Sequence, residues 1–300
     1  MEEQVDNQFS EMDGWTREQV AQFKQSGRLK MYQAEAQIAP LQTEERATPS
    51  QAEEIGTFVA EGDSWFDYLP GTDLIDCLRN HYDYLIENYA KAGDTLENMV
   101  YGTRIDKKFN PVSPTIDQVL LRVQELQPKI FLFSGGGNDA LGQNFDTYLN
   151  HQKSGLPPLR EDYLNNMVNV VYRKYLEDLI AKIAAASPET KIVMHGYGYT
   201  IPTGEGVDFL FITFTGPWLR PVLAEKDILA PEEQRQIVDT IIGRYNSLLT
   251  ELDQQYEKFN FVDLRPLIDP AADWTDELHL RNSAFARAAA KIHETIQALF

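Results

Sequence analysis

Short apolar runs alternate with amphipathic stretches from Ile55 to the end of the chain. Five of the runs are typical of buried strands, because they are short and rich in β-branched and aromatic side chains. The amphipathic stretches place apolar residues three and four positions apart, as helices do. The predicted strands are Thr57–Glu61, Leu85–Lys91, Ile130–Ser134, Lys191–Tyr197 and Phe259–Leu264, and the predicted helices are Pro114–Leu126, Tyr163–Ala186, Glu232–Gln255 and Ser283–Leu299, the last with Asn282 as its N-cap.

Strands that alternate with helices predict an α/β fold with a parallel sheet covered on both faces. No repeat or linker divides residues 55–300, so we expect one domain there. Residues 1–54 are acidic and lack this regularity, and we expect them to form an N-terminal arm that is helical or partly disordered. The unusually apolar stretch Val207–Leu223 has two interpretations: a lid or wall for an apolar group, or a further buried core segment.

Composition excludes some functions. The net charge of −19, from 27 basic and 46 acidic residues, leaves no basic face for nucleic acid. No run of eighteen apolar residues predicts a membrane span, and the start of the chain lacks the layout of a signal peptide, so we expect a cytoplasmic protein. Cys77 is alone, which excludes an intrachain disulfide, and its apolar neighbours predict a buried, inert thiol. No spacing of residues predicts a metal site.

Four polar blocks follow predicted strands or precede helices. They are Gly62-Asp63-Ser64, Ala92-Gly93-Asp94-Thr95, Gly135-Gly136-Gly137-Asn138-Asp139 and Asp276-Glu277-Leu278-His279. Ligand sites in open α/β sheets lie outside the carboxyl ends of the strands, so these blocks are expected to meet.

The residue types in these blocks suit nucleophilic catalysis. A serine hydroxyl needs a histidine to take its proton, and that histidine needs a carboxylate to orient it. Asp276, three residues before His279, can fold back to do this. The N–H groups of Ser64 and Gly93 and the side-chain amide of Asn138 are candidate donors to an oxyanion. Asp63 is expected to brace the turn by hydrogen bonds, and Asp139 to be a helix N-terminal acid.

The order of the four blocks resembles the SGNH (GDSL-like) hydrolase superfamily. The resemblance extends over residues 55–300 and implies a flavodoxin-like three-layer α/β/α sandwich with a five-stranded parallel sheet. It also implies hydrolysis of a small-molecule or lipid ester through an acyl-enzyme, without a cofactor. Ser64 would be the nucleophile, His279 the base and Asp276 its orienting acid, with an oxyanion hole of Ser64, Gly93 and Asn138. The chain departs from the family at Trp65, where the name-giving motif has Leu.

Aromatic residues near strand ends predict an apolar substrate pocket. We expect Trp65, Tyr197 and Trp218 to contact the substrate, and His195 is a further candidate for the pocket wall. His293 is expected to be a surface or satisfied core residue, and His81 and His151 to be solvated.

Two other functions stay open at this point. The same fold with weak catalysis would serve as a binding module. Alternatively, Gly135–Ala140 fits the dinucleotide fingerprint G-x-G-x-x-A after a strand. Against this second reading, the glycines follow the third strand, and no acidic residue ends a strand about twenty residues later.

Overall fold

A computed structural model describes residues 56–68, 72–142, 144–209 and 212–300. The predicted arm at residues 1–54 lies outside these ranges. The main sheet has five parallel strands in the order β2-β1-β3-β4-β7. The strands are β1 (Phe58–Gly62), β2 (Ile86–Asn88), β3 (Ile130–Ser134), β4 (Lys191–His195) and β7 (Phe259–Val262).

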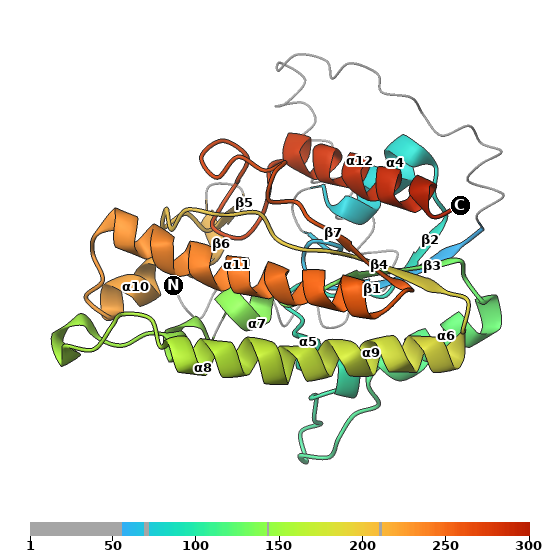
Figure 1. Cartoon of the computed structure of the whole chain (residues 1–300), viewed down its shortest axis with the longest axis horizontal. Coiled ribbons are helices and arrows are strands. Elements are labelled where there is room, and N and C mark those ends of the chain that lie inside the picture. The colour runs from blue at the N-terminus through green and yellow to red at the C-terminus, as the bar shows by residue number, and fades with distance from the viewer. Residues whose placement is uncertain (1–55, 69–71, 143, 210–211) are drawn as a thin grey trace.

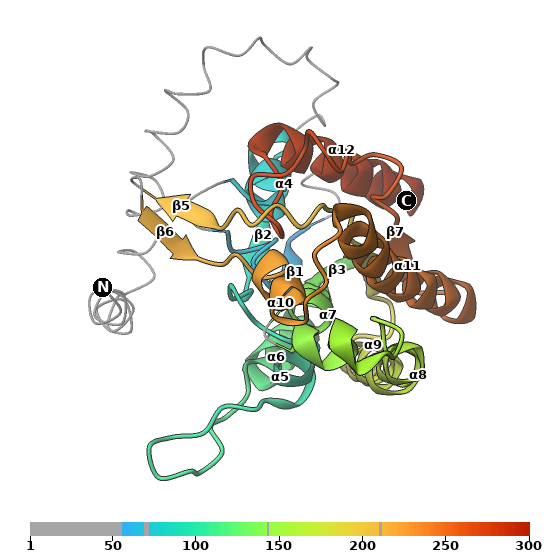
Figure 2. The ribbon, with the colours of Figure 1, turned by 90° about the vertical axis from the view of Figure 1, so that its left-hand side faces the viewer.

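Helices cover both faces of this sheet, which confirms the predicted α/β sandwich. Helices α4 (Leu74–Tyr82) and α12 (Asn282–Ala298) pack side by side over one face. Helices α6 (Thr115–Leu126), α9 (Arg173–Ala186) and α11 (Pro231–Gln255) cover the other face (Figures 1 and 2). The remaining helical segments are α5 (Leu96–Tyr101), α7 (Gly137–Leu141), α8 (Glu161–Asn166), α10 (Arg220–Glu225), the 3₁₀ turns η1 (Phe145–Tyr148) and η2 (Gln152–Ser154), and the π-helical turn η3 (Met167–Tyr172), which joins α8 to α9.

Two of the three inner strands explain why the sequence pattern was readable. Every residue of β1 and of β3 is buried, as expected for parallel strands covered on both faces. The edge strand β2 is shorter than the predicted Leu85–Lys91, since Leu85 lies before it and Tyr89, Ala90 and Lys91 lie after it. Cys77 is buried in the core as predicted.

The start of α12 differs from the prediction by one residue. Arg281 takes the N-cap position, and Asn282 is the first residue of the helix. The side-chain oxygen of Asn282 instead accepts the N–H of Thr72 at 3.3 Å. It therefore links the start of α12 to the segment that leads into α4.

The apolar stretch Val207–Leu223 divides into two parts. Strands β5 (Val207–Phe209) and β6 (Ile212–Thr215) pair antiparallel with each other as a separate two-stranded sheet. Beyond them, Leu219 and Leu223 are fully buried beside and within α10. The core interpretation therefore holds for this second part. No helix within the described ranges is long and apolar enough to cross a membrane.

Candidate active site

The turn after β1 presents Ser64 at the carboxyl end of the sheet. Gly62 lies so close to Ser134 of β3 that an added Cβ would come within 2.8 Å of the Ser134 Cβ, so only glycine fits there. Asp63 then turns the chain, because its Oδ1 accepts the N–H of Trp65 at 3.0 Å. Asp63 is 1% exposed, whereas Ser64 is half-buried. The predicted bracing role of Asp63 is confirmed by these contacts.

A loop after β7 brings His279 against Ser64. The Nε2 of His279 lies 2.8 Å from the Ser64 Oγ, and its Nδ1 lies 3.0 Å from each carboxylate oxygen of Asp276. Asp276 is held by its own loop, because its Oδ1 accepts the N–H groups of Leu278 and His279 at 2.7 and 2.8 Å. These contacts form one chain of hydrogen bonds from a buried carboxylate through an imidazole to a hydroxyl.

Tyr68 supports this chain from the side. Its ring stacks on the His279 imidazole with centroids 4.3 Å apart, and its hydroxyl donates to Asp276 Oδ2 at 3.4 Å. Burial, together with the Asp276 carboxylate, raises the pKa of Tyr68 well above its ordinary value. The phenol therefore keeps its proton and remains a donor. Its role was not apparent from sequence, since nothing local pairs Tyr68 with Asp276.

The two remaining polar blocks lie on either side of the same turn. Asn138, in the first turn of α7, lines a pocket together with Ser64, and its amide donates to the Asp94 carbonyl at 2.8 Å. Gly93 has a left-handed φ of 79° in the turn after β2, and that turn is joined to Gly62 through the N–H of Lys91. Gly93 is not among the residues that line the pocket.

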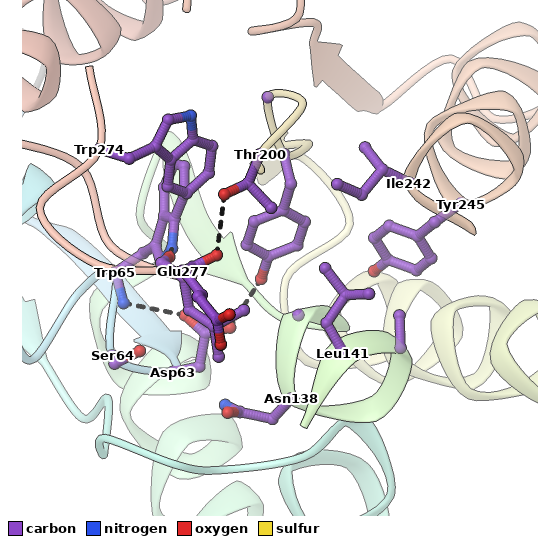
Figure 3. A pocket seen from close by; sticks show the side chains of 15 residues that line it. Asp63, Ser64, Trp65, Asn138, Leu141, Thr200, Ile242, Tyr245, Trp274 and Glu277 are labelled. Atoms are coloured by element: carbon purple, nitrogen blue, oxygen red, sulfur yellow. Dashed lines mark hydrogen bonds between the residues drawn. The ribbon is translucent and has the colours of Figure 1, made fainter. Parts of the chain in front are cut away.

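The pocket beside Ser64 is walled mainly by hydrocarbon. Trp65 and Tyr197 line it as predicted, and Trp274 joins them. Figure 3 shows Trp65 and Trp274 on one side and Leu141, Ile242 and Tyr245 facing them. Trp218 does not line this pocket, and its contact with the substrate stays a prediction. It lies next to the catalytic candidates instead, with its ring edge-on to His279 at 5.7 Å.

His195 is buried behind the pocket wall and does not line it. Its Nε2 lies 3.0 Å from the Oγ of Ser134, which donates to Asp63 Oδ1 at 2.7 Å, while the hydroxyl of Tyr197 donates to Asp63 Oδ2 at 2.6 Å. The His195 ring also stacks on Trp65 at 4.9 Å. Burial lowers the pKa of His195. This network therefore fixes the turn and two rings of the wall.

The other three histidines and Asp139 do not line the pocket beside Ser64. His81 and His151 are exposed as predicted. His293 is a satisfied residue, with its Nδ1 2.8 Å from the Tyr84 hydroxyl. Asp139 lies in the first turn of α7 as predicted, and its carboxylate also accepts the N–H of Leu96 at the start of α5. Burial raises the pKa of Asp139 to about 7.

Aromatic packing accounts for the glycine run after β3. A Cβ on Gly136 would lie 2.1 Å from the Tyr245 hydroxyl oxygen, and a Cβ on Gly137 would lie 2.9 Å from the Tyr197 ring. The Tyr245 hydroxyl donates to the carbonyl of Gly135 at 2.6 Å. The space above these glycines is thus filled by tyrosines, so the glycines need no phosphate group to explain them.

Glu277 is a site residue that sequence reasoning missed. It is fully buried between Asp276 and His279 along the chain, and its carboxylate accepts four backbone N–H groups. Gly204 and Arg220 donate to Oε1 at 2.9 and 3.0 Å, and Trp218 and Leu219 donate to Oε2 at 2.6 Å each. The β5–β6 hairpin lies between these donors, so one carboxylate holds both of its ends. Only tertiary structure reveals those partners.

Glu61 is another buried carboxylate, on the inner strand β1. It is 1% exposed, and within the described residues no hydrogen bond of normal geometry reaches either carboxylate oxygen. Burial, with a smaller effect from Asp94, raises its pKa to about 9, and the Gly62 N–H and Arg104 offset only part of this. Glu61 is therefore neutral in the folded protein at pH 7.

We expect Glu61 to make folding stability depend on pH. Between its unfolded pKa of about 4.5 and its folded pKa of about 9, the unfolded chain releases a proton that the folded chain keeps. The free energy of unfolding should therefore fall as pH rises, by about 1.4 kcal/mol per pH unit. Urea unfolding of wild type and Glu61→Gln at pH 5, 6.5 and 8 measures this effect. The free energy of unfolding of the variant, relative to that of wild type, should rise with pH by that slope. A difference in the free energy of unfolding between the two proteins that is constant across the three pH values would contradict a raised pKa of Glu61.

Comparison with known proteins places these observations in a family. The model of the GDSL-like lipase/acylhydrolase family matches residues 60–287. A search of curated protein sequences found no match. Among solved structures, an extracellular lipase from Streptomyces rimosus is 12% identical with a TM-score of 0.50, covering 81% of this chain and 99% of that one. This likeness shows the fold.

Two further structures are more distant in shape. Phospholipase A1 from Streptomyces albidoflavus NA297 is 12% identical with a TM-score of 0.44, covering 81% of this chain and 99% of that one. The periplasmic domain of a lipopolysaccharide acetyltransferase from Salmonella ser. Paratyphi A is 14% identical with a TM-score of 0.48, covering 84% of this chain and 90% of that one.

Proposed function

Because the chain belongs to the GDSL-like lipase/acylhydrolase family, we propose that it is a serine hydrolase that cleaves a carboxylic ester through an acyl-enzyme. One observation carries this proposal: the unbroken hydrogen-bond chain from Asp276 through His279 to Ser64. A hydroxyl becomes a useful nucleophile at neutral pH only when a base stands within hydrogen-bond distance, and a base keeps its tautomer only when its other nitrogen is bound. The contacts of His279 meet both conditions.

The first half of the reaction forms the acyl-enzyme. The Ser64 Oγ attacks the ester carbonyl carbon while Nε2 of His279 takes the hydroxyl proton. Asp276 stabilises the imidazolium that results and does not itself take the proton. When the tetrahedral intermediate collapses, the C–O bond to the alcohol breaks, and His279 gives the proton to the departing alkoxide oxygen.

The second half removes the acyl group. Water attacks the ester carbonyl of acylated Ser64, with His279 again as the general base, and collapse returns the proton to Ser64 and releases the carboxylic acid. The same two groups thus serve in both halves.

The oxyanion of each intermediate needs donors that are already in place. The N–H groups of Ser64 and Gly93 and the amide of Asn138 take this role in our proposal. An asparagine amide carries two N–H bonds, and the carbonyl of Asp94 binds one of them. That bond holds the amide plane and leaves the second N–H for the oxyanion. The positive φ of Gly93 supports its part, since it lets the backbone of that turn face outward without a side chain.

Covalent trapping tests the proposal directly. Diisopropyl fluorophosphate should phosphorylate the protein once, at the peptide containing Ser64, and hydrolysis of p-nitrophenyl acetate should fall in proportion to labelling. Heat-unfolded protein is the control and should stay unlabelled, because the reactivity depends on His279. A folded protein that hydrolyses no ester and takes no label would instead be a binding module with this fold.

A further inference from the structure

The pocket beside Ser64 is small. Its volume is about 30 Å³, on a scale where one water needs roughly 10–15 Å³. It therefore has room for a group of roughly two or three heavy atoms beyond the reacting carbonyl. A long hydrocarbon chain needs many times this space.

Its aromatic walls are held in place by their polar ends. The Trp65 indole N–H donates to the Leu278 carbonyl at 3.0 Å, the Tyr197 hydroxyl to Asp63 at 2.6 Å, and the Tyr245 hydroxyl to Gly135 at 2.6 Å. Each of these rings is at most 7% exposed. A ring that swung aside to admit a longer chain would leave a buried donor unpaired, which is unfavourable. These hydrogen bonds therefore hold the rings in place and keep the pocket small.

The glycine run removes any space behind the rings. Tyr245 and Tyr197 pack directly on Gly136 and Gly137, closer than any side chain at those positions would permit. Ile242 of α11 and Leu141 of α7 close the far side (Figure 3). The pocket thus ends at packed core.

The wall also lacks a charge that a ligand could use. Asp63 and Glu277 are its charged members within the described residues. Asp63 accepts hydrogen bonds from Trp65, Ser134 and Tyr197, and Glu277 accepts its four backbone N–H groups. Both carboxylates are therefore engaged within the protein. An uncharged acyl group fits such a wall better than a charged one.

We propose that this pocket binds the acyl part of the substrate and restricts the enzyme to short, uncharged acyl groups, from acetyl to about butyryl, with Ile242 setting the length limit. The proposal rests on the proposed function. Ile242 is a specificity residue here, because its side chain occupies the place that the next carbons of a longer acyl chain would take.

A chain-length series with matched variants tests this proposal. The substrates are the p-nitrophenyl esters of acetate, butyrate, octanoate and palmitate, so that only the acyl group varies. Wild type should have a kcat/KM for octanoate at least about tenfold below that for acetate or butyrate. Ile242→Ala should raise the octanoate-to-acetate ratio about tenfold, since it opens the wall.

Ile241→Ala is the control, because Ile241 precedes Ile242 on the same helix and is equally buried without lining the pocket. Its chain-length ratio should match wild type. If Ile242→Ala does not fold, Leu141→Ala opens the same end of the pocket from α7.

The outcomes separate the two proposals. Ser64-dependent activity that peaks at octanoate or palmitate, or a ratio that shifts equally in both isoleucine variants, would overturn the acyl-length limit and leave the ester hydrolase standing. Hydrolysis of every ester at the same rate with and without Ser64 would overturn the proposed function, and the acyl-length proposal with it.

Discussion

Replacing Ser64 by alanine should lower kcat/KM for p-nitrophenyl acetate by about 10⁴-fold or more. The change removes the oxygen that forms the covalent intermediate in our proposal, and Ser64 is the one residue in the described ranges whose hydroxyl hydrogen-bonds to His279. Stability should change little, because Ser64 is half-buried and its hydroxyl hydrogen-bonds to His279 alone within the described ranges. Initial rates and thermal unfolding of the same preparations measure both effects.

The control for this variant is Ser154→Ala, which removes an exposed hydroxyl from η2. It should retain wild-type activity. A Ser64→Ala protein that keeps even a tenth of the wild-type rate, with Ser154→Ala unchanged, would show that another group is the nucleophile.

Replacing His279 by alanine should have an effect of similar size, about 10⁴-fold. Without the imidazole, no group in the described structure is placed to take the Ser64 proton. Asp276 still accepts the two N–H groups of its own loop, so we expect the loop to remain in place. The control is His81→Ala, an exposed change on α4, which should retain the wild-type kcat/KM.

The double variant makes this prediction sharper. Residues that act as one unit lose their joint effect when either is removed, so Ser64→Ala with His279→Ala should be no slower than either single variant. Labelling by diisopropyl fluorophosphate should also become slow in His279→Ala. A double variant whose loss is the product of the two single losses would contradict a shared mechanism.

The strands of the sheet could be predicted because burial made their sequences distinct. The inner strands β1 and β3 have no solvent face, so their apolar runs stand out from the amphipathic helices around them. The long helices α6, α9 and α11 were predicted for the opposite reason, since each has one buried stripe. Short α4 and α5 were missed, because six to nine residues carry too few turns to show a period.

The candidate site was predictable where polar residues follow one another along the chain in a recognisable order. Ser64, Asn138, Asp276 and His279 stood in an order that resembles a family, and the fold brings them to one edge of the sheet. Trp218 was expected to contact the substrate because its stretch is apolar, but apolar character alone does not tell which neighbours a ring will have, and its ring lies edge-on to His279 outside the pocket lining.

The residues that were missed have partners far along the chain. Glu277 binds backbone N–H groups about sixty to seventy positions away, and Tyr68 contacts an aspartate more than two hundred positions away. Backbone donors carry no sequence signature, so no pattern around Glu277 could reveal them. Such contacts become visible only when the chain has folded.

The way in which Glu277 holds the β5–β6 hairpin has a consequence for how such enzymes diverge. Its carboxylate joins the chain before and after the hairpin at a single point, so the closure of that loop does not depend on what the loop contains. The entropic cost of closing a loop, expressed as free energy, rises by only about 0.6 kcal/mol for each doubling of its length. Insertions, deletions and exchanges between Gly204 and Trp218 can therefore accumulate while Asp276 and His279 keep their positions. The hairpin can therefore change in length and sequence without a change in the anchor that closes it.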